Sequence, residues 1–200
     1  MKRIGVLGGT FNPVHKGHLA LAAAAMSEYA LDQIIFMPSG TPPHKPKEVI
    51  DKEDRFNMVK LAIGGIGDYS ISRLELDRPG YSYAIDTFDQ LRKKYGEKVK
   101  LFYIMGLDSI NDILSWKKPL ELFKLCEFIV GTRPGTRIRT FRRLVKFPPL
   151  QKEVDNIHLM ELKEDISSSD IRKKIKEGRS VERIVPKKVV DYIKKRELYK

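Results

Sequence analysis

Two histidines spaced three residues apart follow a pair of glycines near the start of the chain, in Gly8-Gly9-Thr10-Phe11-Asn12-Pro13-Val14-His15-Lys16-Gly17-His18. Glycines directly after an apolar run let the backbone approach a ligand closely and point N–H groups at phosphate oxygens. His15 and His18 share one face of a helical turn, so both can face the same ligand, and Gly17 leaves room for it. The segment predicts that a nucleotide is held at the end of a first strand.

Other interpretations of this segment are weaker. The dinucleotide pattern G-x-G-x-x-G and the P-loop pattern ending in Gly-Lys-Ser/Thr do not occur in the chain, and a glycine turn alone is not specific. An isolated histidine is more often a helix cap or a packed core residue, and a His-x-x-His pair can hold zinc. Cys126, the single cysteine, is distant and no acidic ligand lies near the pair, so no protein-bound metal is expected.

A second anion site is indicated near the C-terminus by Ile166-Ser167-Ser168-Ser169-Asp170-Ile171-Arg172. The serine hydroxyls suit a helix N-cap, and the helix that they open presents free N–H groups to an anion. The planar guanidinium group of Arg172 would add a fixed positive charge. The alternative is an ordinary capped surface helix, and only the pairing with the first loop makes the serine run informative.

The apolar runs that must position these loops alternate with helical patterns, of which the first is His18–Tyr29. The runs are Ile4–Leu7, Ile34–Met37, Ile71–Leu76, Leu101–Met105 and Phe128–Val130. The alternation predicts an α/β fold, a Rossmann-like doubly wound parallel sheet with binding loops at the carboxyl ends of its strands. The expected loops are Gly8–His18, Pro38–Lys47, Asp77–Tyr83, Gly106–Asn111 and Gly131–Gly135. Together they can build one site at one rim.

The length of 200 residues predicts a single domain over residues 1–200, with a small helical C-terminal subregion at about 165–200. Helical patterns are expected over Thr136–Phe147 and from Pro186 to Leu198, and Pro148-Pro149 is expected to mark a turn. No run approaches the ~20 apolar residues that span a bilayer, so we expect a cytoplasmic protein without a membrane role.

The formal charge of +12 is concentrated in the last third, where residues 133–200 hold 20 basic and 10 acidic side chains. Such an excess favours phosphate-bearing partners. An RNA-binding module with a nucleotide-fold core is therefore an alternative function, although basic surfaces alone overpredict nucleic-acid binding. We expect nucleotides rather than nucleic acid, and a homo-oligomer is possible.

The first loop resembles the T/H-x-G-H signature of the nucleotidylyltransferase superfamily, and Ile166–Arg172 resembles its second signature, Ile-Ser-Ser-Thr-x-Ile-Arg. Within that superfamily the chain, from residue 4 to about residue 198, is similar to bacterial nicotinate mononucleotide adenylyltransferases. Further matching segments are Pro42-Pro43-His44-Lys45, Ser82-Tyr83-Ala84-Ile85-Asp86-Thr87, Gly106-Leu107-Asp108, Trp116 and Arg133-Pro134-Gly135.

This resemblance implies transfer of AMP from ATP, with Mg²⁺, onto nicotinate mononucleotide, which yields nicotinate adenine dinucleotide and pyrophosphate in NAD biosynthesis. Other adenylyltransferases of the superfamily, acting on both nicotinamide and nicotinate mononucleotides or on phosphopantetheine, are alternatives. The attacking 5′-phosphate is already ionised at neutral pH, so positioning and electrostatics suffice for catalysis. The histidines are therefore expected to donate hydrogen bonds to ATP phosphates rather than to carry protons.

The resemblance also implies roles for individual residues. Those expected to act in catalysis are His15, His18, Lys45 and Arg172. Those expected to bind ATP are Gly8, Gly9, Thr10, Phe11, His15, His18, Gly106, Asp108, Arg133, Ser168, Ser169 and Arg172. Those expected to bind the mononucleotide are His44, Lys45, Tyr83, Ala84, Asp112, Trp116 and Arg133. Trp116 would lie against the pyridine ring, and backbone N–H groups of Ala84 and Asp112 would receive the nicotinate carboxylate.

Asp112 stands where an aromatic residue is frequent in that family. A carboxylate beside the nicotinate group is unfavourable unless it points away. A weakened preference for nicotinate over nicotinamide is therefore expected.

Overall fold

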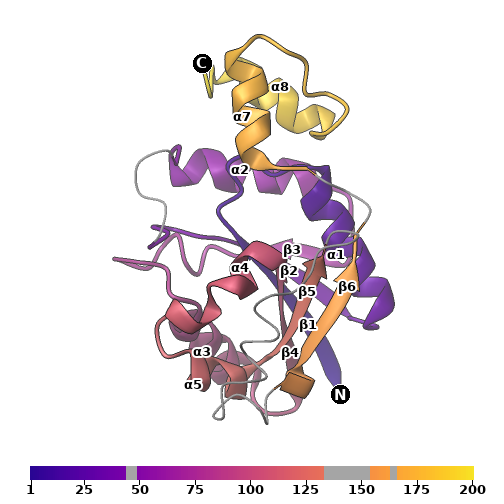
Figure 1. Ribbon diagram of the computed structural model, residues 1–200, viewed down its shortest axis with the longest axis vertical. Coiled ribbons are helices and arrows are strands. Elements are labelled where there is room, and N and C mark those ends of the chain that lie inside the picture. The colour runs from indigo at the N-terminus through magenta and orange to yellow at the C-terminus, as the bar shows by residue number, and fades with distance from the viewer. Residues whose placement is uncertain (44–48, 133–153, 163–165) are drawn as a thin grey trace.

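Six parallel strands form one sheet in the computed structural model, in the order β3-β2-β1-β4-β5-β6 (Figure 1). The structure describes residues 1–43, 49–132, 154–162 and 166–200. The strands are β1 (Lys2–Gly9), β2 (Gln33–Pro38), β3 (Tyr69–Ile71), β4 (Val99–Gly106), β5 (Glu127–Thr132) and β6 (Ile157–Glu161). The strand order reverses between β1 and β4, and ligands bind at the carboxyl ends of the strands at such a switch point. The predicted Rossmann-like doubly wound sheet is confirmed.

Helices cover both faces of this sheet. On one side lie α1 (Lys16–Glu28) and α2 (Lys52–Ile63), with α7 (Ser168–Lys176) and α8 (Lys187–Lys195) beyond them at one end of the molecule (Figure 1). On the other side lie α3 (Ala84–Tyr95), α4 (Leu107–Asn111) and α5 (Pro119–Leu125). Short 3₁₀ helices, η1 (Ile113–Ser115) and η3 (Val154–Asn156), complete the described elements. No described helix is both long and apolar enough to cross a membrane.

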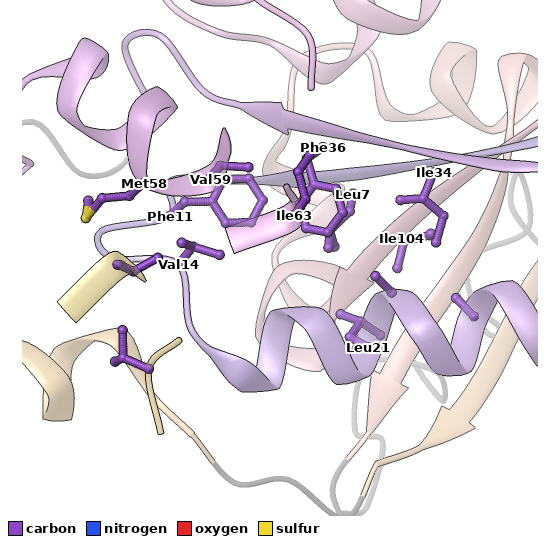
Figure 2. Packing of buried hydrophobic residues seen from close by; sticks show 14 of the residues in the cluster. Leu7, Phe11, Val14, Leu21, Ile34, Phe36, Met58, Val59, Ile63 and Ile104 are labelled. Carbon is purple, nitrogen blue, oxygen red and sulfur yellow. The ribbon is translucent and has the colours of Figure 1, made fainter. Parts of the chain in front are cut away.

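Alternate side chains of β1 enter different halves of the core. Leu7 belongs to the cluster beneath α1 and α2, whereas Ile4 and Val6 belong to the cluster beneath α3 and α5. Burial on both faces is why the strands appear in the sequence as continuous apolar runs rather than as alternating patterns. Phe11 and Val14, from the loop after β1, also enter the first cluster, close to α2 (Figure 2). Their burial anchors that loop in the core.

The third strand is placed differently from the prediction. β3 covers Tyr69–Ile71, whereas the predicted run was Ile71–Leu76. Residues 74–76 form a turn, which is closed by the N–H of Asp77 donating to the carbonyl of Arg73 at 2.9 Å. Leu76 is buried in this turn (1% exposed). Its burial produces the same apolar signal as a strand, and this explains the error.

The other predicted elements agree more closely with the structure. The first helix covers Lys16–Glu28 rather than His18–Tyr29, and the last one starts after Pro186, which is its N-cap. The sheet also contains β6, Ile157–Glu161, which was not among the five predicted runs and which pairs with β5. Thr136–Phe147 and Pro148-Pro149 lie outside the described residues.

The loop after β2 is tied to the segment that precedes α3. The N–H of Gly40 donates to Oγ of Ser82 at 2.9 Å, and the N–H of Ser82 donates to the carbonyl of Thr41 at 2.9 Å. A Cβ atom on Gly40 would lie 2.3 Å from the carbonyl oxygen of Glu75. Glycine at this position therefore permits two loops at the rim of the sheet to pack backbone against backbone.

Replacement of this glycine provides a test of the packing. Because the added methyl group must displace backbone, Gly40→Ala should lower the free energy of unfolding by about 2 kcal/mol, measured by urea denaturation. Gly67→Ala is the matched control, since a Cβ there has no heavy atom within 4 Å. Equal stability of the two variants would contradict the proposed close approach.

Candidate active site

A cleft of about 1540 Å³ opens at the carboxyl ends of the strands, where residues of all five predicted loops meet the start of α7. The predicted site residues that line it are Gly8, Gly9, Thr10, Phe11, His15, His18, Tyr83, Ala84, Gly106, Trp116, Ser168, Ser169 and Arg172. The fold thus brings together the two segments that were predicted to bind phosphate and the aromatic segment, which are far apart in the sequence.

The remaining predicted residues lie elsewhere or are not described. His44, Lys45 and Arg133 lie outside the described residues, as does the side chain of Asp108. Asp112 is not among the residues that line the cleft. It follows α4 with its side chain exposed, and its N–H donates to the carbonyl of Ser109 at 3.3 Å.

The two histidines stack on each other at the start of α1. Their ring centroids lie 3.7 Å apart with planes inclined by 29°. The backbone N–H of His15, the N-cap residue, donates to Nδ1 of His18 at 3.2 Å. Since Nδ1 of His18 accepts this bond, the proton of the neutral ring lies on Nε2. His18 therefore keeps one N–H that can donate to a ligand.

Both histidine rings are neutral at physiological pH. Burial lowers the pKa of His15 to about 4. Burial, and secondly the neighbouring His15, lowers the pKa of His18 well below its ordinary value. Desolvation disfavours the charged form of an imidazole, and two stacked rings oppose each other's charge. This state fits hydrogen-bond donation to phosphates and leaves no cationic histidine to act as an acid.

The glycines of the first loop make room mainly for the walls of the site. A Cβ atom on Gly17 would lie 3.1 Å from Nδ1 of His15, and one on Gly8 would lie 2.7 Å from the ring of Tyr103. Gly17 itself lines the cleft, and its lack of a side chain also keeps it clear of the His15 ring. Gly17 permits the histidine stack, and Gly8 permits Tyr103 to reach the cleft.

Side chains of the second signature donate hydrogen bonds to backbone carbonyls of the first loop. Nη1 of Arg172 donates to the carbonyl of Asn12 and Oγ of Ser168 donates to that of Pro13, each at 3.0 Å. A hydroxyl has only one proton to donate, so in this arrangement Ser168 holds the loop rather than a phosphate. The hydroxyl of Tyr199, the penultimate residue, donates to Oδ1 of Asn12 at 2.9 Å. The C-terminal segment therefore helps to set the conformation of the first loop.

Arg55 of α2 is the main positioning residue that the sequence did not reveal. Its side chain is buried (1% exposed), and burial lowers the pKa of its guanidinium. The guanidinium donates to the carbonyl of Thr10 at 2.9 Å, of Ser39 at 2.6 Å and of Gly40 at 2.9 Å. It thereby joins the loops after β1 and β2. The surrounding charged residues of α2 suggest an ordinary solvated helix, so no sequence signal marks this arginine.

Aromatic side chains gather in one part of the cleft, its aromatic end. The ring centroid of Trp116 lies 6.1 Å from that of Tyr103, and Tyr81 and Tyr83 are also 6.1 Å apart. Lys117 places its ammonium 4.7 Å from the ring centroid of Tyr83. All five of these side chains line the cleft. This end can hold a flat ring, since aromatic faces stack on one another.

The buried carboxyl group of Glu75 belongs to a hydrogen-bond network next to this aromatic end. Oγ1 of Thr87, in the first turns of α3, donates to Oε1 of Glu75 at 2.7 Å, and Arg78 donates to the same hydroxyl oxygen at 3.1 Å. Burial raises the pKa of Glu75. The network connects the turn after β3 to α3, whose start lines the cleft with Tyr83 and Ala84.

Comparison with known proteins points to one family. The model of the family described as "Cytidylyltransferase-like" matches residues 6–174. A Thermoanaerobacter sp. (strain X514) protein named "Probable nicotinate-nucleotide adenylyltransferase" is 43% identical over 99% of this chain and 94% of its own. A Moorella thermoacetica protein of the same name is 42% identical over 99% of this chain and 92% of its own.

A solved structure shares the fold over the full length. The Plasmodium falciparum nicotinic acid mononucleotide adenylyltransferase complexed with NaAD has a TM-score of 0.79 at 20% identity, covering 100% of this chain and 98% of its own. At this level of identity the likeness establishes the fold.

Substitution of Arg55 tests whether one guanidinium holds the two loops. Arg55→Lys keeps the charge but cannot supply the planar fork to three carbonyls. It should lower the free energy of unfolding by about 3 kcal/mol, measured by urea denaturation. Arg73→Lys is the matched control, because the Arg73 fork binds Glu53 and Asp77 on the exposed surface; its stability should stay close to that of the wild type. Similar losses in both variants would contradict the assigned role.

The low pKa of His15 predicts a pH dependence of stability. Above pH 6.5 this histidine is neutral in both folded and unfolded chains. Between pH 6.5 and about 4 the unfolded chain binds a proton that the folded chain excludes. The free energy of unfolding should therefore fall through this range by on the order of 3 kcal/mol from His15 alone. Urea titrations at several pH values should show a flatter profile for His15→Gln, and parallel profiles would contradict the prediction.

Proposed function

The chain belongs to the cytidylyltransferase-like family, and we propose that it acts as a nicotinate-nucleotide adenylyltransferase, which transfers AMP from ATP to nicotinate mononucleotide. The observation that carries this proposal is that a neutral histidine pair, a helix N-terminus and a group of aromatic side chains line the same cleft. The full-length relatives named for this activity, at 42–43% identity, support it.

The histidine end of the cleft suits the phosphates of ATP. His18 offers its Nε2 proton, and α7 directs its N-terminus, with Ser167 as N-cap, toward the same part of the cleft. Helix N-termini and fixed N–H donors stabilise negative charge where it develops. In the transfer, an oxygen of the acceptor 5′-phosphate bonds to the α-phosphorus of ATP, and the bond from that phosphorus to the bridging oxygen breaks to release pyrophosphate. No side chain needs to move a proton.

The aromatic end suits the pyridine ring of the acceptor. Trp116, Tyr83 and Tyr103 line the cleft there, and the rings of Trp116 and Tyr103 lie 6.1 Å apart. Single small-molecule sites occupy roughly 300–1,000 Å³, and the cleft of about 1540 Å³ is larger. The volume is therefore sufficient for two nucleotides bound together, which in-line transfer between them requires.

We propose that Mg²⁺ enters with ATP as part of the substrate. No group of three or more metal-ligating side chains occurs among the residues that the structure describes. The only described carboxylate lining the cleft, Glu75, already accepts a hydrogen bond from Thr87. The ion would therefore be held mainly by phosphate oxygens, and it would share their charge as pyrophosphate leaves.

The direct test supplies the purified protein with ATP, Mg²⁺ and either nicotinate or nicotinamide mononucleotide. Pyrophosphate release and chromatography of the dinucleotide should show product with the nicotinate compound. Absence of product with both compounds would refute the proposal. Equal rates would instead identify an enzyme that accepts both acid and amide.

Removal of His18 tests the assignment of the phosphate donor. His18→Ala should lower kcat by about 10²–10³-fold, because one preorganised donor to the developing charge is lost. His158→Ala is the matched control, since His158 lies on β6 and pairs with Glu127 at 2.7 Å. Steady-state kinetics at saturating ATP would make the comparison. A wild-type kcat in His18→Ala would show that another group stabilises the phosphates.

A further inference from the structure

Two cationic side chains belong to different parts of the cleft. Among the described residues that line it, Arg172 and Lys117 are the cations. Arg172 is hydrogen-bonded to the first loop, whereas Lys117 follows Trp116 and contacts the ring of Tyr83. The phosphates of ATP account for a positive charge beside the first loop but not for the one beside the aromatic rings.

The ammonium of Lys117 is held beside the start of α3. Nζ lies 3.0 Å from Oδ2 and 3.1 Å from Oδ1 of Asp86, and 4.7 Å from the ring centroid of Tyr83. The side chain of Lys117 is 43% exposed and that of Asp86 is 36% exposed. Exposed ion pairs of this kind contribute little to stability. The ammonium can thus turn from Asp86 to a ligand carboxylate at small cost.

A cation at this end distinguishes an acid from an amide. Nicotinate and nicotinamide mononucleotides have the same ring and differ by one negative charge, and stacking on Trp116 or Tyr83 would favour neither. A lysine ammonium attracts the carboxylate by charge and hydrogen bonding, whereas the amide gains only a hydrogen bond. Asp112, expected to oppose the carboxylate, is exposed and does not line the cleft.

We propose that Lys117 is a specificity-determining residue, whose ammonium makes the protein prefer the carboxylate-bearing mononucleotide over its amide. The inference rests on the proposed function and adds to it the group that selects the acceptor. Asp86 orients the ammonium in the free protein and releases it when the carboxylate binds.

The experiment measures kcat/KM for both mononucleotides in the wild type and in Lys117→Gln, with ATP and Mg²⁺ saturating. The variant should lose about tenfold in kcat/KM for the acid, mostly through KM, while the value for the amide changes less than about twofold. Lys117→Arg keeps the charge and should retain most of the preference.

Lys118→Gln is the matched control. Lys118 is the next residue, it pairs with Glu121 at 3.2 Å, and it does not line the cleft. Its acid-to-amide ratio should equal that of the wild type. An unchanged ratio in Lys117→Gln, or an equal loss in Lys118→Gln, would overturn the role of Lys117 alone. A wild type that accepts neither mononucleotide would overturn the proposed function and this inference with it.

Discussion

The geometry of the site depends on the buried guanidinium of Arg55. This single group donates to carbonyls of Thr10, Ser39 and Gly40, which belong to the loops after β1 and β2. A buried charge is costly unless hydrogen bonds replace its lost hydration, and buried carbonyls are costly unless a donor meets them. Each therefore stabilises the other. The loops after β1 and β2 are held together by these hydrogen bonds.

The first loop is also held from its other side by the C-terminal segment. Arg172, Ser168 and Tyr199 all donate to Asn12 or Pro13, and Phe11 of the same loop is buried in the core cluster that holds Val14 and Met58 (Figure 2). A loop fixed at its carbonyls and at a core side chain can keep the histidine stack in place at the start of α1. Burial lowers the pKa of both rings, which favours their neutral form and leaves them able to donate hydrogen bonds to phosphates.

The proposed function assigns different tasks to two parts of the cleft. Around the histidine pair, neutral donors and a helix N-terminus would stabilise the charge that changes during the transfer. Around Trp116, aromatic rings would hold the pyridine ring, and the exposed Lys117 would provide the charge that separates an acid from an amide. In this proposal, reactivity and acceptor choice depend on separate residues.

The sequence by itself determined the sheet and identified two segments as candidates for phosphate binding. Five apolar runs separated by helical patterns identify a doubly wound sheet, and the His15–His18 and Ser167–Arg172 spacings are local enough to be recognised. Only the tertiary structure decided the turn at residues 74–76, the use of Gly17 by the His15 ring, and the exposure of Asp112. It also decided the role of Arg55, whose partners lie up to 45 residues away. The physical reason is that periodicity reports which residues are buried, whereas the contacts between distant loops depend on how the elements pack.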